Sequence, residues 1–500
     1  MNISFENKLA SSYREIYHQT RKVQETTESV VPDVNDDIGK IASVQTSVLL
    51  KSKDLTGRGV LVSGEAIAAL LYITENEKNV SYVRMTKPFS IEYELEAVDA
   101  DTVAQIKLDI INCEARVLNP RKVSVTFEIS GELSCFRQEN ITVETLLPAN
   151  TAESVHAKYE TAELIYTNAV CEKTFTLSEQ FVFPSGKPSP SKLIMQKAEY
   201  IINDTQLIGT KLIVKGTTEL SVCYLSEDVN YPVRSDYSTA FSQIIELGEE
   251  AMENCSVMIE LSSLYCDIVS TISGEKALDV EIHAVMQIVC RSRKKLRYIS
   301  DVYSNLMPGE CVVNKHTITS AASNQQLKII ADERISVVDD CSDVLSVFYA
   351  LSQLSLQPDK ISAAVILDVV YRGKSGNISA VRRLINLGTE CTRRPDRLIG
   401  ARLSDVYIRP DGANIDVHMA MDVKYLSLNT AELNRVESVV FNEDECIDLS
   451  VYPTVSLVRA ENEDIWELAK LYHSSVERIC AVNDLTELTT GKLLLIPKSI

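Results

Sequence analysis

An internal repeat of about 150 residues constrains the fold of this 500-residue chain more than any other feature of its sequence. Residues 60–64 match residues 212–216, and each stretch ends in a glycine that is followed eight residues later by a tyrosine. The same offset of 152 residues carries Phe89 onto Phe241. A weaker third copy has Ala363 where the glycine would stand. Units of this length are too long for solenoid repeats and fit tandem domains.

Apolar residues that recur at every second position predict β-strands within each copy. This alternation runs through residues 123–129, 278–282 and 415–421. Turn signals such as Asn119-Pro120 and Pro410-Asp-Gly412 separate the runs. Short strands at regular spacing predict a mainly β fold of tandem antiparallel sandwich-like domains.

The N-terminal segment is expected to be helical instead. Phe5, Leu9, Tyr13 and Tyr17 recur in steps of four residues, which is compatible with a short amphipathic helix. A linker marked by Pro32 follows. We therefore expect a helical segment at 1–29, β domains at 30–150, 151–300 and 301–445, and a small domain at 455–500.

The C-terminal stretch predicts a strand, two helices and a second strand. Residues 455–458 form a short apolar run typical of a strand. Residues 464–467 and 474–477 each have the pattern of a capping box, which marks a helix start. Residues 492–497 form a closing strand that ends in a proline, which cannot donate to a strand ladder.

This order and its residues resemble a LysM domain, a small α+β module. The residues that fit the family pattern are Ile465, Trp466, Leu468, Ala469, Tyr472, Ser475, Val476, Ile479, Asn483, Gly491, Leu494, Ile496 and Pro497. Where the family has Gly-Asp-Thr, this chain has Asn462-Glu-Asp464. The resemblance implies that two loops bind N-acetylglucosamine chains in a typical member, and the lost glycine and added carboxylate depart from that site.

The candidate binding surface consists of residues on or beside these two loops. Trp466 is the only tryptophan of the chain, and it has two interpretations: packing in a small core, or anchoring a partner at the surface. The candidate residues are Asn462, Glu463, Asp464, Trp466, Tyr472, Asn483 and Leu485.

The tandem β repeats, the entry Val30-Val-Pro-Asp33 and the LysM-like end together resemble SPOCS-domain spore coat proteins of the SipL type, which are coat morphogenetic proteins. The resemblance implies a mother-cell cytoplasmic protein that helps to localise the coat at the forespore surface. The implied partners are the coat-basement morphogenetic ATPase or other coat proteins, contacted through the LysM and β domains. The alternative is a protein that binds peptidoglycan of the cell wall or spore cortex.

Composition excludes several classes of partner. The formal net charge of −20 argues against nucleic acid and anionic membranes, which both require basic patches. No apolar run approaches the roughly 18 residues of a membrane span, and the N-terminus lacks an apolar signal core. The twelve cysteines are scattered without a Cys-x-x-Cys motif, so we expect reduced, mostly buried thiols.

No constellation of residues predicts an enzyme, a metal site or a cofactor. Gly373-Lys-Ser375 resembles the end of a phosphate-binding loop, but Asp368 occupies the position of the first glycine, so a hairpin turn is expected. The six histidines are far apart in the sequence and none has a ligand-spaced partner. We expect a non-enzymatic interaction protein.

Overall fold

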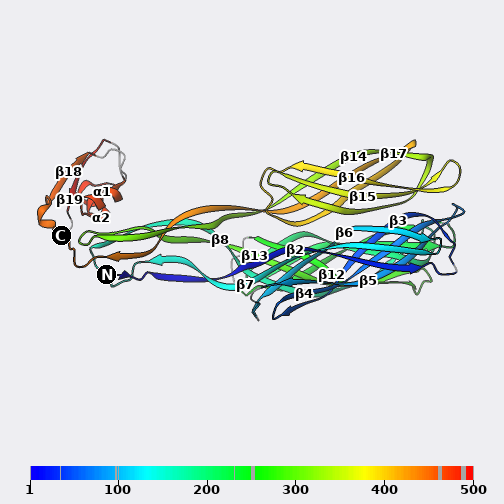
Figure 1. Ribbon diagram of the computed structural model, residues 1–500, viewed down its shortest axis with the longest axis horizontal. Coiled ribbons are helices and arrows are strands. Elements are labelled where there is room, and N and C mark those ends of the chain that lie inside the picture. Colours follow the sequence, from blue (N-terminus) through cyan, green and yellow to red (C-terminus); the bar gives the residue numbers. More distant parts are fainter. Residues whose placement is uncertain are drawn as a thin grey trace.

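The computed structural model describes residues 2–33, 35–95, 98–99, 101–229, 231–248, 254–459, 464–485 and 491–498. The molecule is elongated (Figure 1). A strand-rich body fills one end, a narrower stalk of long strands extends from it, and a small helical lobe lies at the far end of the stalk. The expected mainly β fold is confirmed, with a small C-terminal α+β region.

The body and stalk consist of three units that share one strand order. In units 1 and 2, a long first strand pairs with the long last strand, which also pairs with the fifth strand. The second, third and fourth strands form a separate three-stranded sheet. All pairings within units 1 and 2 are antiparallel, and buried apolar side chains join the two sheets of each unit. Each of these units is therefore a two-layer sandwich whose long strand pair continues into the stalk (Figure 1).

The strand bounds follow the repeat. Unit 1 contains β2 (Glu6–Val30), β3 (Ile38–Thr56), β4 (Gly59–Thr74), β5 (Val80–Glu94), β6 (Val103–Asn119) and β7 (Lys122–Leu146). Unit 2 contains β8 (Val155–Val182), β9 (Pro190–Ile208), β10 (Lys211–Ser226), β11 (Val233–Glu246), β12 (Asn254–Ser270) and β13 (Lys276–Ser304). Unit 3 contains β14 (Gly309–Leu356), β15 (Lys360–Gly373), β16 (Ile378–Glu390) and β17 (Arg397–Phe441), and β1 (Asn2–Ile3) pairs with the end of β17.

Unit 3 reaches the same arrangement with fewer, longer strands. Residues 309–336 of β14 pair with β17, whereas residues 341–356 pair with β15. The N–H of Asp396 donates to the carbonyl of Leu426, and Ser404 Oγ donates to the carbonyl of Ala420. These bonds place the first part of β17 beside its second part, so the chain reverses at Gly412, where the backbone has a φ of 59°.

The expected N-terminal helix is wrong, because residues 6–30 form β2. A step of four residues returns to the same face of a strand as well as of a helix, so the spacing of Leu9, Tyr13 and Tyr17 does not separate the two. Pairing along the whole of β7 decides in favour of the strand. That pairing partner lies about a hundred residues away in the sequence, beyond the reach of a local pattern.

The alternation predicted from the sequence places the core. Val123, Val125, Phe127 and Ile129 on β7 are fully buried against β4 and β5. The equivalent alternating residues of β13 and β17 are buried in the same way. Apolar burial on one face of each sheet is therefore the main force that closes each sandwich.

The repeated glycine and phenylalanine are cross-strand partners. Gly64 lies opposite Phe89, and Gly216 lies opposite Phe241. A Cβ atom at Gly216 would come within 2.5 Å of the Phe241 ring and 2.2 Å of the Ile201 carbonyl oxygen. The ring therefore covers the bare backbone of the glycine, which explains why the two residues recur together at one offset.

In unit 3 neither residue of this glycine–phenylalanine pair is present. Ala363 lies opposite Leu387, so the glycine and the phenylalanine are both replaced. The irregularity in the strand pairing also moves. It lies beside Gly216 in unit 2 but between Ala364 and Val365 in unit 3.

The three units pack around a shared apolar centre. This cluster is formed by Ala69 and Leu71 of unit 1, Ile194 and Cys223 of unit 2, and Phe348 and Val370 of unit 3. A second shared cluster lies in the stalk and contains Ala10, Val143, Leu164, Leu296, Tyr298 and Leu433. The units therefore depend on one another for burial of their apolar side chains, and they are not independent beads on a string.

Buried polar groups join the units as well. Asp368 is buried, receives two bonds from Arg382 of its own unit at 2.6 and 2.8 Å, and accepts a bond from Ser43 of unit 1 at 2.8 Å. The N–H of Ile106 donates to Gln287 Oε1, and Gln287 Nε2–H donates to the carbonyl of Ile106, both at 2.7 Å. These two bonds link β6 of unit 1 to β13 of unit 2. Such bonds fix the relative position of two sheets because an unpaired buried partner is costly.

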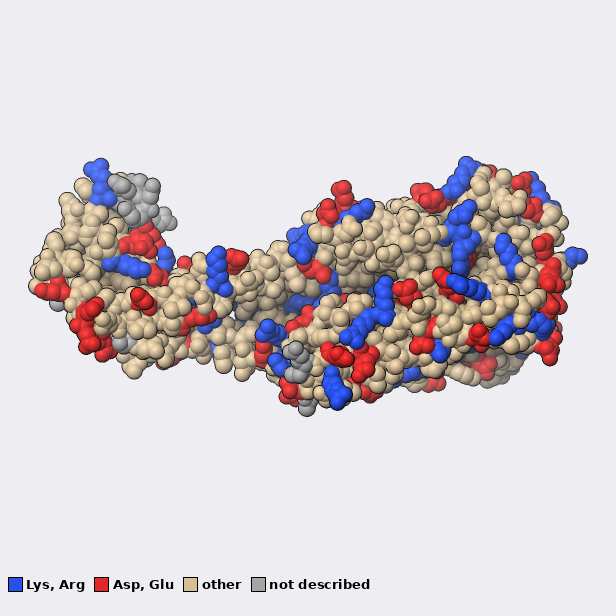
Figure 2. All heavy atoms as spheres, viewed as in Figure 1, with Lys and Arg blue, Asp and Glu red and all other residues tan. Residues whose placement is uncertain are grey.

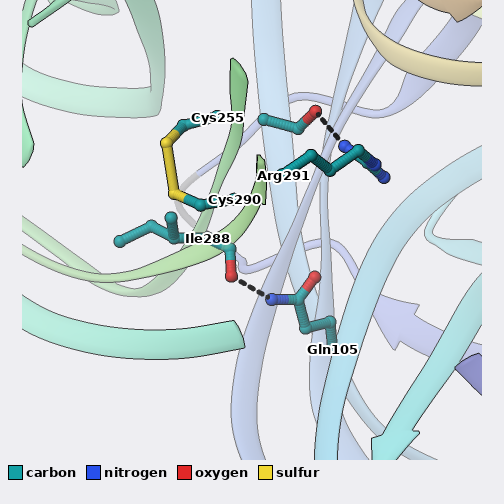
Figure 3. Close-up of a disulfide and its surroundings, with 6 residues drawn as sticks. Gln105, Cys255, Ile288, Cys290 and Arg291 are labelled. Atoms are coloured by element: carbon teal, nitrogen blue, oxygen red, sulfur yellow. Dashed lines mark hydrogen bonds between the residues drawn. A yellow bond between two sulfur atoms is a disulfide. The ribbon is translucent and has the colours of Figure 1, made fainter. Parts of the chain in front are cut away.

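A disulfide joins Cys255 and Cys290, which corrects the expectation that every thiol is reduced. The two residues lie directly opposite each other on β12 and β13. Close to the disulfide, the side-chain amide of Gln105 from unit 1 donates to the carbonyl of Ile288 (Figure 3). The other ten cysteines are free. The sequence did not reveal the pair because only the strand register brings two residues 35 positions apart together.

The Gly373-Lys-Ser375 segment is a turn, as expected. It begins the connection between the antiparallel strands β15 and β16, and Gly376 completes the turn with a φ of 85°. Among the helices that the structure describes, none is long and apolar enough to cross a bilayer.

We predict that Gly216→Ala lowers the free energy of unfolding by about 1–3 kcal/mol, because the new methyl group must displace the Phe241 ring or the Ile201 carbonyl. Gly186→Ala is the matched control, since no atom lies within 4 Å of a Cβ there. Urea denaturation followed by circular dichroism measures both. Equal stability of the two variants would contradict the packing role assigned to the repeated glycine.

Candidate functional site

The C-terminal lobe is the candidate site, and it lies at the end of the molecule farthest from the body (Figure 1). A short 3-10 helix precedes it, and its two strands form an antiparallel pair that packs on two helices. The elements are η1 (Leu449–Val451), β18 (Val455–Arg459), α1 (Ile465–Leu471), α2 (Val476–Asn483) and β19 (Leu493–Pro497). The strand–helix–helix–strand order predicted from the sequence is confirmed.

The helix starts are capped largely as the sequence indicated. The Asp464 carboxylate accepts a bond from the N–H of Trp466 at the start of α1. At the start of α2 the cap is Ser475, which accepts from the N–H of Arg478, and not Ser474 as expected. Ser474 Oγ donates instead to the carbonyl of Pro497, so it ties the inter-helix turn to β19.

Trp466 lies buried between the lobe and the tip of the stalk. Its ring meets Tyr303 of β13 edge-on, with ring centroids 4.8 Å apart, and its Nε1–H donates to Asp301 Oδ2 at 2.8 Å. The Tyr303 hydroxyl donates in turn to the carbonyl of Ser474 at 2.9 Å. Trp466 therefore packs in the core of the lobe, and it also anchors the lobe to its own chain.

Two ion pairs surround this contact. Lys470 lies 2.6 Å from Asp301, and Lys158 of β8 lies 2.7 Å from Asp464. The bond from Lys158 holds the pKa of Asp464 below its ordinary value. Charged hydrogen bonds that flank a buried aromatic pair give the lobe a defined orientation on the stalk.

The structure places the predicted site residues unequally. Asn462 and Glu463 lie outside the described residues. Asp464 and Trp466 face the stalk. The Asn483 side chain bonds to the main chain of β19, whereas Tyr472 and Leu485 are half-buried against the lobe core. A direct role of these residues in binding a partner stays a prediction.

The residues that seat the lobe were not predictable from the sequence. Lys158, Asp301 and Tyr303 belong to the stalk strands β8 and β13, which precede the lobe by more than a hundred residues. No local pattern marks them. Their role follows only from the path of the long strands, which bring the tip of unit 2 beside α1.

An apolar face on the lobe was also missed. The outward apolar side chains of the two strands are Val455, Leu457, Leu493 and Leu495, with exposed fractions of 48, 64, 52 and 43%. Leu457 lies opposite Leu495 in the strand register. The signal was present in the sequence, because residues 493–496 are all apolar and residues 455, 457 and 458 are apolar too, which puts apolar side chains on both faces. We call these four residues the outer face.

A second candidate place is the cavity of about 1060 Å³ between the three units of the body. Its lining includes Lys107, which pairs with Asp109 at 2.8 Å, and Lys424, which donates to the carbonyl of Ile202. Both positive and negative side chains line it, so the lining does not select a ligand of one charge. Burial raises the pKa of Glu260 in this lining to about 8, and the nearby Asp109 adds to the rise.

Metal binding and charge steering find little support in the part of the chain that the structure describes. No group of three or more His, Cys, Asp or Glu side chains in it could hold a metal ion. On the face shown in Figure 2, basic and acidic side chains are interspersed over the body. The outer face of the lobe thus stands out by its apolar character and not by charge.

Comparison with known proteins gives one match. Residues 37–118 and 190–269 match the family described as SipL, SPOCS domain. These stretches cover β3 to β6 of unit 1 and β9 to most of β12 of unit 2, so the two matches fall on equivalent strands of the repeat. No curated protein and no solved structure matches the chain. The matches support a SipL-like SPOCS protein and a role related to the spore coat.

We predict that Asp301→Ala weakens the seat of the lobe by about 1.5–3 kcal/mol, because Trp466 and Lys470 both lose a charged acceptor. Trp466 is the only tryptophan, so its fluorescence reports the seat directly. The emission should shift to the red while the β signal in circular dichroism stays unchanged. Asp279→Ala, on the same strand but without a bond to the lobe, should leave the emission as it is. Identical emission from both variants would show that Asp301 does not hold the lobe.

We predict that Glu260→Gln flattens the pH dependence of stability. The folded state keeps a proton on Glu260 up to about pH 8, whereas the unfolded state releases it near the ordinary value of 4.5. Stability of the wild type therefore falls as pH rises through this window. Melting curves between about pH 5 and pH 9 should show this fall in the wild type and in Glu179→Gln, an exposed control, but less of it in Glu260→Gln. Parallel curves for all three proteins would refute the assignment.

Proposed function

We propose that this chain, as a SipL-like SPOCS protein, is a non-enzymatic scaffold of spore coat assembly. It acts in the mother-cell cytoplasm at the forespore surface and contacts the coat-basement morphogenetic ATPase or another coat protein through its LysM-like lobe. The observation that carries the proposal is the outer face, whose four apolar side chains are 43–64% exposed at the end of the stalk. Exposed apolar groups that gather on one surface mark contact sites for proteins.

The shape of the molecule supports this role. The stalk carries the lobe away from the body, and the aromatic and ionic seat gives it a fixed orientation. A body of three repeated units offers further surfaces at a distance from the lobe. Weak contacts on one rigid molecule strengthen one another because the second contact forms at a raised effective concentration.

Binding of peptidoglycan is the competing function. Its support is the strand–helix–helix–strand order of the lobe, which is shared with glycan-binding LysM domains. The contacts of Asp464 with Lys158 and of Trp466 with Asp301 weigh against it, because they engage one end of the first loop with the stalk. The test below therefore includes a glycan arm.

We predict that replacing all four outer-face residues by threonine abolishes recruitment of a fluorescent fusion to the forespore in sporulating cells. Threonine keeps the preference for strands while it removes the apolar surface. The control is Leu471→Ser with Val482→Ser, which are 67 and 50% exposed on the helices of the same lobe. In parallel, purified full-length protein is sedimented with peptidoglycan. Recruitment that survives the four substitutions, or sedimentation with peptidoglycan, would contradict the scaffold proposal.

A further inference from the structure

The hydrogen-bond pattern of the lobe shows which backbone groups of its two-stranded sheet point outward. The N–H of Lys498 donates to the carbonyl of Thr454 at 3.1 Å, so these two residues form a hydrogen-bonded pair. Along an antiparallel ladder, hydrogen-bonded pairs alternate with pairs whose backbone groups point away from the partner strand. Ser456 and Val458 therefore direct their backbone N–H and C=O groups toward β19. Val455, Leu457 and Arg459 direct theirs away from it.

The two edges of this sheet differ. On β19 the outward groups of Leu495 and Pro497 are satisfied: the Asn483 amide bonds to the N–H and carbonyl of Leu495 at 2.8 and 2.6 Å, and Ser474 donates to the carbonyl of Pro497. On β18 no described residue bonds to the outward backbone groups of Val455 or Leu457. Among the residues that the structure describes, the edge of β18 is therefore open, and the outer face flanks it.

Two edge strands of the body carry residues that protect against pairing. The outermost strand β5 carries Lys87 and Pro88, and β16 carries Arg382 and Arg383. Charged residues and proline on an edge prevent the addition of a further strand. Within β18 neither occurs before the last residue, Arg459. The edge of β18 thus lacks the protection that β5 and β16 have.

We propose that β18 accepts an extended peptide segment of a partner protein as a third strand of the lobe sheet. Backbone bonds to Val455 and Leu457 would hold the segment, and its alternate side chains would lie beside Leu457 and over the outer face. Arg459 is exposed at one end of this edge, and Lys492 lies just before β19 at the same end of the sheet, so the segment carries a carboxylate at that end. The inference deepens the proposed function, on which it rests, by defining how the lobe contacts its protein partner.

A different protein fits this edge better than a second copy of this chain. Two copies would bring together molecules that each carry a formal net charge of −20. Pairing of two β18 strands would also place Arg459 of each copy beside a β18 strand that offers no carboxylate to pair with it.

The test uses the full chain and two fluorescein-labelled peptides in which valine and threonine alternate, one flanked by glutamates and one by lysines. Fluorescence anisotropy should show binding of the glutamate peptide and at least threefold weaker binding of the lysine peptide. Leu457→Pro removes an outward N–H together with the leucine side chain and should weaken binding at least tenfold. Leu457→Thr keeps the N–H but removes an apolar contact and should weaken it less. Leu471→Ser is the exposed control and should bind like the wild type.

Three results would overturn the inference. One is the absence of binding to the glutamate peptide, and another is equal binding by wild type and Leu457→Pro while Trp466 emission shows an intact seat. The third is a dimer in sedimentation that Leu457→Pro dissociates, since it would make a second copy the occupant. If the peptide test fails but recruitment in cells still requires the outer face, the scaffold proposal survives and only the strand-addition mode is lost.

Discussion

The antiparallel pairing of the first and last strands within each unit is the interaction on which the rest of the structure depends. In unit 1 this pair is β2 with β7, in unit 2 it is β8 with β13, and in unit 3 the ends of β14 and β17 form it. Each pair contributes one layer of a sandwich and then continues into the stalk. Because the same strands form both the sandwich layers and the stalk, the body sets the direction in which the stalk extends.

Burial between the units converts three such pairs into one rigid object. Apolar side chains from all three units meet in the body and again in the stalk, and Asp368 and Gln287 add buried polar contacts between neighbouring units. The stalk ends at Asp301 and Tyr303, which hold Trp466. A chain of packed contacts thus runs from the body to the lobe, and the outer face is presented at a fixed place.

The sequence predicted those features that local periodicity encodes. Alternation in β7, β13 and β17 identified core strands, and the fixed offset of Gly64 and Phe89 from Gly216 and Phe241 reflected a real cross-strand contact. Features that depend on distant pairing were not predictable. The spacing in β2 fits a helix and a strand equally, and only its partner β7 decides. The seat of Trp466 and the Cys255–Cys290 disulfide likewise exist because strands remote in sequence become neighbours.

The most direct test of this account is hydrogen–deuterium exchange on the full chain, resolved along the long strands. The account predicts that stalk amides, such as those of residues 156–166 in β8 and 291–303 in β13, exchange as slowly as the sandwich amides of the same strands, because they open only when the whole body opens. Fast exchange throughout the stalk beside a protected body would contradict it. The stalk would then be a set of separate hairpins, and the lobe would have no fixed orientation.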